Sequence, residues 1–305
     1  MIKINESSLI CLALQGKVAH ADEFLPFEVG HDGTPRAVPG TGSITYNVKV
    51  GDTAFGWASD HTEPGVSTVC ITDEKAFARG YNFLSCIGNE VRVVNGDAKG
   101  AKGIVTGKHG GVEHVLIDFP QDVLEKLSFD DKFIIKSLGQ GLELSDYKDV
   151  RCYNLSPALV KKMNIREKAG ALEIGVTHIV PAGIMGSGIG SLSCARGDYD
   201  VTTQDPENIK NYRLDKIRLG DIIAIQDADN SFGRTTKKGA VSICVVVHCN
   251  SFVAGHGPGV TTVITTPITG RIKPFIDSHA NIAELLKIGK HRKKGTPRYS
   301  IFYNL

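Results

Sequence analysis

Short apolar runs constrain the fold of this chain more than any other feature of its sequence. They recur along most of its length, and Gly, Pro, Asn or Asp bounds each of them. This pattern is typical of β-strands joined by turns, because side chains alternate along a half-buried strand and those four residue types favour turns. We therefore expect strands at 9–14, 43–50, 66–71, 91–94, 103–106, 112–118, 132–137, 171–180, 221–226, 241–247, 261–266 and 271–276.

Helical signals are few. Thr72 is a candidate N-cap for an apolar-periodic stretch that continues to residue 83, and Ser156 precedes a proline that suits the first turn of a helix. The remaining helices are expected at 120–127, 206–212 and 278–288. The sequence therefore predicts a mainly β protein of the β-rich α+β class. It has a barrel-like N-terminal domain at 1–150 and, at 151–305, a β-rich C-terminal domain with a few short helices. The boundary is placed where the composition turns helical and charged, over 151–170.

One short pattern occurs three times. An apolar-x-apolar-Gly-Asp turn precedes a strand at 48–52 and at 217–221, and a related turn ending in Asp-Asp occupies 127–131. Glycine reaches the positive φ values that sharp reversals need. These turns predict repeated corners of a barrel or sandwich rather than a βαβ series.

Charge and cysteine usage exclude several classes of protein. A net charge of +2 provides no field for nucleic acid, and none of the seven cysteines lies in a CxxC pair, so reduced thiols are expected. No apolar run is long enough to span a bilayer, and the first residues lack a signal-peptide pattern. We expect a cytoplasmic protein without a membrane partner. The segment 88–107 resembles a KOW-like hairpin; an RNA-binding barrel is our third hypothesis, behind a hairpin with solvated lysines.

A glycine-rich segment at 180–191 is the first candidate binding element. It lacks the Gly-Lys-Ser/Thr ending of a P-loop, and its glycine spacing does not match the dinucleotide fingerprint. The backbone N–H groups around Gly186, Ser187 and Gly188 could cradle a phosphate or carboxylate. A surface loop without a ligand is the alternative interpretation.

Charged side chains follow this segment. In an extended stretch Asp198 and Asp200 point to the same side, so they could share a cation or a proton. We place Arg196, Asp198 and Arg234 in the substrate site, with the arginines holding an anionic group. A polar turn with an internal Arg–Asp pair is the alternative.

Two histidines in the C-terminal half indicate chemistry. His248 ends a strongly apolar strand, and His256 lies in a glycine-flanked turn that offers little packing to explain it. Asp227, His248 and His256 could perform acid–base catalysis. Alternatively, His178, Asp227 and His248 could bind a divalent metal, and imidazole with carboxylate suits zinc or iron. Both interpretations remain open.

The N-terminal half pairs histidine with aspartate in two loops, at His31 and His61. These loops either complete the C-terminal site across a domain interface or are ordinary polar loops.

The motifs HIVPAGIMGSGIG, RGDYDVTTQDP, IQDADNSFGR and GHGPGVTTVIT together resemble an uncharacterised bacterial family with a rift-related barrel at its N-terminus. The resemblance implies a two-domain β-rich fold and no particular chemistry. The segment GTGSITYNVKVGDTAFGWA is similar to the acetamidase and formamidase group, which implies hydrolysis of small amides at a metal-associated site. No site position is carried over from that group.

These observations lead to two main hypotheses. The first is a hydrolase, acting on C–N bonds, that uses a metal or acid–base groups on a small polar or anionic metabolite. The second is a ligand-binding or assembly protein in which the glycine-rich loops build subunit contacts. In both cases we expect a small-molecule ligand and a homo-oligomer, and no nucleic-acid partner.

Overall fold

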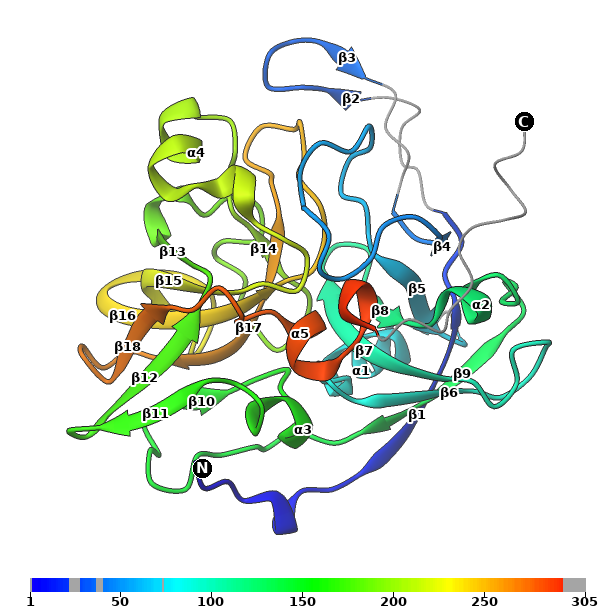
Figure 1. The fold of residues 1–305 in the computed structure, drawn as a ribbon, viewed down its shortest axis with the longest axis horizontal. Coiled ribbons are helices and arrows are strands. Elements are labelled where there is room, and N and C mark those ends of the chain that lie inside the picture. The colour runs from blue at the N-terminus through cyan, green and yellow to red at the C-terminus, as the bar shows by residue number, and fades with distance from the viewer. Residues whose placement is uncertain (1, 22–27, 37–40, 73, 293–305) are drawn as a thin grey trace.

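The computed structural model describes residues 2–21, 28–36, 41–72 and 74–292, and it shows a mostly β molecule built of two β-rich parts (Figure 1). Within these residues no helix is long and apolar enough to cross a membrane. The predicted β-rich fold class is confirmed.

The N-terminal part is a closed barrel. Its sheet has the strand order β1-β9-β6-β7-β8-β5-β4, and β1 also pairs with β5, so six strands close the ring and β4 lies outside it. All of its pairings are antiparallel, which suits short loops between neighbours. The strands are β1 (Leu12–Val18), β4 (Ile44–Thr45), β5 (Gly65–Cys70), β6 (Glu90–Val93), β7 (Lys102–His109), β8 (His114–Asp118) and β9 (Lys132–Ser137), and β2 (Glu28–Val29) pairs with β3 (Pro35–Arg36) apart from the barrel.

The C-terminal part is built on a sheet of order β10-β17-β16-β15-β13, to which β14 adds through β17. A second sheet, β11-β12-β18, packs beside it. Nearly every residue of β17 and of the second half of β16 is buried, and neither segment carries a charged side chain. The strands are β10 (Arg151–Cys152), β11 (Ile165–Lys168), β12 (Ala171–Val176), β13 (His178–Pro181), β14 (Tyr199–Asp200), β15 (Ile222–Asp229), β16 (Thr235–Val246), β17 (Gly259–Thr266) and β18 (Ile272–Ile276).

The described residues form five short α-helices near the expected positions, but the first begins at Lys75 and has Glu74, not Thr72, at its N-cap. The expectation for 206–212 is confirmed in full, and Ser156 caps its helix by accepting from the Leu159 N–H. The helices are α1 (Lys75–Leu84), α2 (Gln121–Leu124), α3 (Pro157–Val160), α4 (Pro206–Tyr212) and α5 (Ile282–Leu286). The helical interpretation of 151–170 was partly wrong, because β11 is a strand. Pairing with β12 decides its conformation, and propensity does not.

The repeated turn has a common structure. Asp52, Asp131 and Asp221 each accept the backbone N–H of the residue three positions earlier, at 2.8–3.0 Å. The first and third turns also bond to each other, because the Gly51 N–H donates to the Leu219 carbonyl at 2.8 Å. These turns therefore fasten the N-terminal part to the C-terminal sheet.

A shared core joins the two parts. Ile87 and Leu116 from the barrel belong to the same buried cluster as Ile243 and Val263 from the C-terminal sheet. The end of β7 reaches β17, where the Thr261 hydroxyl donates to the Lys108 carbonyl at 3.0 Å. This contact places the tip of the β7–β8 hairpin against the C-terminal sheet, and the candidate site lies there.

Candidate functional site

A polar cavity of about 320 Å³ opens between the tip of the β7–β8 hairpin and the segment 187–200. The barrel contributes His61 and His109 to its wall, and the C-terminal part contributes Asp198, Asp200 and His256. The site is therefore composed of segments that lie far apart in the sequence.

The two carboxylates come from one short strand. Asp200 lies in β14 opposite Gly259 of β17, and Asp198 lies two residues earlier, so both side chains face the same way. Both residues are almost fully buried. Asp198 Oδ1 accepts the Gly110 N–H at 2.7 Å, whereas Asp198 Oδ2 points towards His248.

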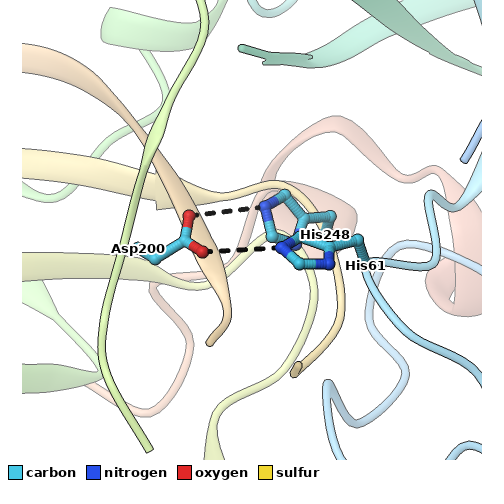
Figure 2. Close-up of side chains that lie close together, drawn as sticks. All are labelled: His61, Asp200 and His248. Carbon is cyan, nitrogen blue, oxygen red and sulfur yellow. Dashed lines mark ion pairs between the residues drawn. The ribbon is translucent and has the colours of Figure 1, made fainter. Parts of the chain in front are cut away.

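His248 faces both carboxylates. Its Nδ1 lies 2.8 Å from the Cys249 carbonyl oxygen, which can only accept, so Nδ1 carries a proton. Its Nε2 lies 2.9 Å from Asp198 Oδ2 and 3.7 Å from Asp200 Oδ1 (Figure 2 shows the contact with Asp200). Among the described residues, neither His248 Nε2 nor Asp198 Oδ2 has a hydrogen-bond partner. The two atoms are only 2.9 Å apart, but their alignment is poor for a hydrogen bond to each other. Two metal ligands that face the same cation are expected to have this geometry.

Two more histidines repeat this orientation. His109, the last residue of β7, places Nδ1 2.6 Å from Glu63 Oε1, and its ring lies 4.3 Å from that of His248. His61 contacts Asp60 through Nδ1, and its Nε2 lies 3.7 Å from Asp200 Oδ2 (Figure 2). In each of the three rings Nδ1 contacts an oxygen atom of a neighbouring residue. Each Nε2 then faces the carboxylates, which is the usual arrangement of metal-binding histidines, and in His61 this atom also lies 3.0 Å from His256 Nδ1.

The ligand atoms of these groups form two overlapping sets of three that share His248, and either set has a spacing that fits one ion. His61, Asp200 and His248 have ligand atoms within 4.8 Å of one another, and so do His109, Asp198 and His248. Two donors about 2.1 Å from one ion stand about 3.0 Å apart at a right angle and about 4.2 Å apart on opposite sides. The separations of 2.9 Å and 3.7 Å between histidine nitrogens and carboxylate oxygens lie close to or within that window.

Electrostatics bind the cluster together. Burial lowers the pKa of His248, but Asp198 and Asp200 outweigh burial and raise this pKa well above its ordinary value. Burial also opposes the charged form of His61, yet Asp200 and Asp60 raise its pKa to about 9. The pKa of Asp200 lies well below its usual range, because the neighbouring histidines overcome its burial. The cluster thus concentrates negative charge that either protons or a cation must balance.

His256 lies at the mouth of the cavity. Its Nδ1 is 3.1 Å from Asp200 Oδ2 and 3.0 Å from His61 Nε2, and 31% of its side chain is exposed. It therefore connects the buried cluster with solvent, which suits a group that accepts or releases a proton.

The structure brings together most of the residues that the sequence singled out. Asp198, His248 and His256 belong to the cluster, and Ser187, Gly188, Arg196 and Arg234 line the same cavity. Gly186 lies beside the cavity, where its N–H donates to the Asp200 carbonyl at 2.8 Å. His61 joins the site across the two parts of the chain. His31 does not line this cavity, and its N–H donates to the Phe252 carbonyl.

Asp227 and His178 lie elsewhere, so two predictions are corrected: the ligand set of His178, Asp227 and His248, and the place of Asp227 in an acid–base set with His248 and His256. β15 and β16 are antiparallel, with Ile222 opposite Val245, so Asp227 near the end of β15 and His248 after the end of β16 occupy opposite ends of the pair. Asp227 instead accepts the Gly239 N–H at 2.6 Å and caps the hairpin.

His178 lies on β13, on the far side of β15 from β16. Its Nδ1 lies 2.9 Å from the Thr177 hydroxyl.

Sequence reasoning missed His109 and Glu63 as site residues. His109 precedes Gly110 and Gly111, and a glycine neighbour is the signal that singled out His256. Glu63 offered no such signal, because its role depends on contacts with His109 and His114 in another strand pair.

Comparisons with known proteins agree with the fold. The chain is similar to a solved structure, the crystal structure of TM1086, with 48% sequence identity and a TM-score of 0.88, over 93% of this chain and 98% of that chain. No curated protein matches the sequence, and nothing in these comparisons supports the similarity to the acetamidase and formamidase group. Two models of a domain of unknown function, DUF4438, match residues 27–161 (N-terminal) and 162–286 (C-terminal). The chain therefore belongs to the DUF4438 family, which confirms the resemblance to an uncharacterised family with an N-terminal barrel.

Proposed function

We propose that this protein is a metal-dependent hydrolase that acts on a small polar or anionic metabolite. One observation carries the proposal. Three imidazole rings, His61, His109 and His248, each have Nδ1 against an oxygen, and they surround the buried carboxylates Asp198 and Asp200 in a cavity of about 320 Å³. Five donors of these two kinds suit a divalent transition metal.

The donor set narrows the choice of ion. Imidazole with carboxylate suits zinc or iron, but zinc in structural sites takes four ligands. Each three-ligand set instead combines two histidines with one aspartate, which suits a catalytic zinc or an iron ion. At least one coordination position would then remain for water or substrate, as catalysis requires.

The neighbouring groups support hydrolysis. A divalent ion held by these residues would supply a nucleophile near neutral pH, because such ions lower the pKa of water. His256, whose Nδ1 lies 3.1 Å from Asp200 Oδ2, would accept a proton from the attacking water and deliver it to a leaving nitrogen or oxygen. The exposed edge of His256 connects this proton with solvent.

Metal content and activity test the proposal together. Purified protein should retain close to one equivalent of iron, manganese or zinc after dialysis, and it should hydrolyse at least one member of a panel of small amides, esters and phosphoesters. His248→Asn and Asp200→Asn should lose both properties. Asp227→Asn, a matched carboxylate outside the site, should keep both. A protein that binds no ion, or whose hydrolysis persists without one, would rule the proposal out.

A non-catalytic assembly protein is the second candidate, and exposed apolar side chains favour it. Leu192 is 92% exposed and lies between Ser191 and Ser193 of the cavity wall, and Phe232 is 81% exposed and lies two residues before Arg234 of the same wall. Such side chains beside a cavity often mark contacts between chains. Light scattering on wild type and on a Leu192→Ser, Phe232→Ser double variant separates the candidates: a loss of oligomer with retained hydrolysis supports the enzyme.

A further inference from the structure

We propose that the cavity holds an oxyanion, a carboxylate or a phosphate, between Arg196 and Arg234, beside the cluster of histidines and aspartates. This inference rests on the proposed function and narrows its substrate class from polar or anionic to anionic. It assigns the ion-binding cluster to one part of the cavity and substrate recognition to another.

Arg234 is a buried guanidinium without a counterion. The residue is only 4% exposed, and no carboxylate lies within ion-pair distance of it in the described part of the chain. Its terminal nitrogens donate to the backbone carbonyls of Gly188, Arg196 and Asp198, and its plane lies over the Tyr199 ring. Its Nε is buried and makes no hydrogen bond among the described residues.

The three carbonyls satisfy part of this guanidinium, but Nε has no acceptor and no opposite charge offsets the loss of hydration, which is unfavourable for a buried charge. Arg234 lines the cavity, so an anion bound there would supply both the missing charge and a partner for a free donor. Guanidinium groups match the geometry of carboxylates and phosphates, since two N–H groups can bond two oxygens at once.

Arg196 provides a second guanidinium in the wall of the same cavity. Its side chain is 38% exposed, and its NH1 lies 3.4 Å from Glu113 Oε1, a long contact for an ion pair. Its terminal nitrogens therefore remain accessible to a ligand. The hydroxyl-bearing residues Ser187 and Ser193 line the cavity as well and offer further donors to an oxyanion.

The charges of the lining residues agree with this assignment. Asp198 and Asp200 are directed at the ion cluster, so they balance a divalent cation. Two guanidiniums then remain against the single carboxylate of Glu113, which leaves the wall of the binding site net positive. A cavity of about 320 Å³ accommodates only a small molecule, so the anionic group and the hydrolysed bond lie a few atoms apart.

Calorimetry with defined probes tests the inference. Metal-loaded protein is titrated at fixed ionic strength with inorganic phosphate, with malonate and with malonamide, the neutral analogue of malonate. Wild type should bind phosphate or malonate, and malonamide at least tenfold more weakly. Arg196→Gln should weaken anion binding about tenfold or more while metal content stays unchanged. Arg234→Gln also removes three contacts to backbone carbonyls and can fail to fold, so Arg196 carries the test.

Arg36→Gln is the matched control, because the Arg36 side chain is 37% exposed and also pairs with a carboxylate. Anion binding that survives in Arg196→Gln, or malonamide that binds as well as malonate, overturns the inference.

Repeating the titrations on chelator-treated protein separates the two proposals. If wild type holds no metal but still binds phosphate through Arg196, the hydrolase proposal fails and the anion site stands. If phosphate binding depends on the ion and is unaffected in Arg196→Gln, the anion site fails and the hydrolase proposal stands.

Discussion

Glu63 offers a demanding test of the metal site, because it is not a proposed ligand but contacts the Nδ1 atom of one, His109. Its carboxylate is fully buried and faces four donors: the Nδ1 atoms of His109 and His114, the Gly42 N–H and the Ser67 hydroxyl. Burial alone would raise its pKa, yet His114 and His109 hold this pKa well below the usual range, so the group is a carboxylate at neutral pH. Glu63→Gln replaces one acceptor oxygen with an NH₂ donor at nearly constant volume.

Either orientation of the new amide causes a conflict. If its NH₂ group faces His109, Nδ1 of that ring must accept, and the ring proton moves to Nε2, which then cannot bind a metal. If the NH₂ group faces Gly42 instead, two donors oppose each other in a buried place. Hydrogen bonds to charged groups contribute about 1.5–3 kcal/mol each, so the variant should lose about 2–4 kcal/mol in its free energy of unfolding. Metal affinity should fall about 10–100-fold, as is common for a lost partner of a ligating histidine.

Two measurements on the same samples check this prediction, namely denaturant unfolding and a calorimetric titration with manganese or zinc. Glu284→Gln is the control, because Glu284 Oε2 also faces a histidine, His279 Nδ1 at 2.8 Å, outside the site. The control should leave metal affinity unchanged. If Glu63→Gln folds and binds the ion as tightly as wild type, His109 is not a ligand and the reasoning is refuted.

Two further predictions concern close packing and thiol reactivity. A Cβ added at Gly259 would overlap Asp198 Oδ2 and His248 Nε2, so Gly259→Ala should abolish metal binding, whereas Gly183→Ala, where a Cβ meets open space, should leave it intact in the same assay. Burial raises the pKa of both Cys194 and Cys244 to about 12, so at pH 8 a disulfide reagent should modify the exposed Cys11 quickly and these two buried thiols only after denaturation. Rapid modification of all seven cysteines in native protein would contradict the buried assignment.

Much of the secondary structure was predictable from the sequence, because strands and turns depend on local residue patterns. The expected strand at 132–137 has the same bounds in the structure, and the run 171–180 contains two strands separated at Thr177. The repeated turns predicted either a barrel or a sandwich, and the resemblance favoured the barrel, since no local pattern encodes the pairing of Gly16 with Cys70 that closes it. Register between distant strands depends on the packing of the whole sheet.

The candidate site shows the same division. Alternation along β14 correctly placed Asp198 and Asp200 on one side, and the glycine-flanked turn identified His256. The prediction for Asp227 was wrong, because the sequence does not show which end of a strand lies at the site. Only the antiparallel register of β15 and β16 shows that the end of β15 with Asp227 lies far from His248.

The location of the site follows from how the two parts meet. Beside His109, the fully buried Lys108 donates to the Asn154 side chain at 2.7 Å and to the carbonyls of Phe83 and Ala195 at 3.0 Å and 3.1 Å. Three acceptors match the three hydrogens of an ammonium group, so the charge is solvated by the protein. Apolar contacts tolerate small shifts, whereas hydrogen bonds lose strength steeply with angle and distance. A polar junction therefore fixes the segment that leads to Asp198 against the strand that carries His109, with the precision that ligands from two halves of a chain need to share one ion.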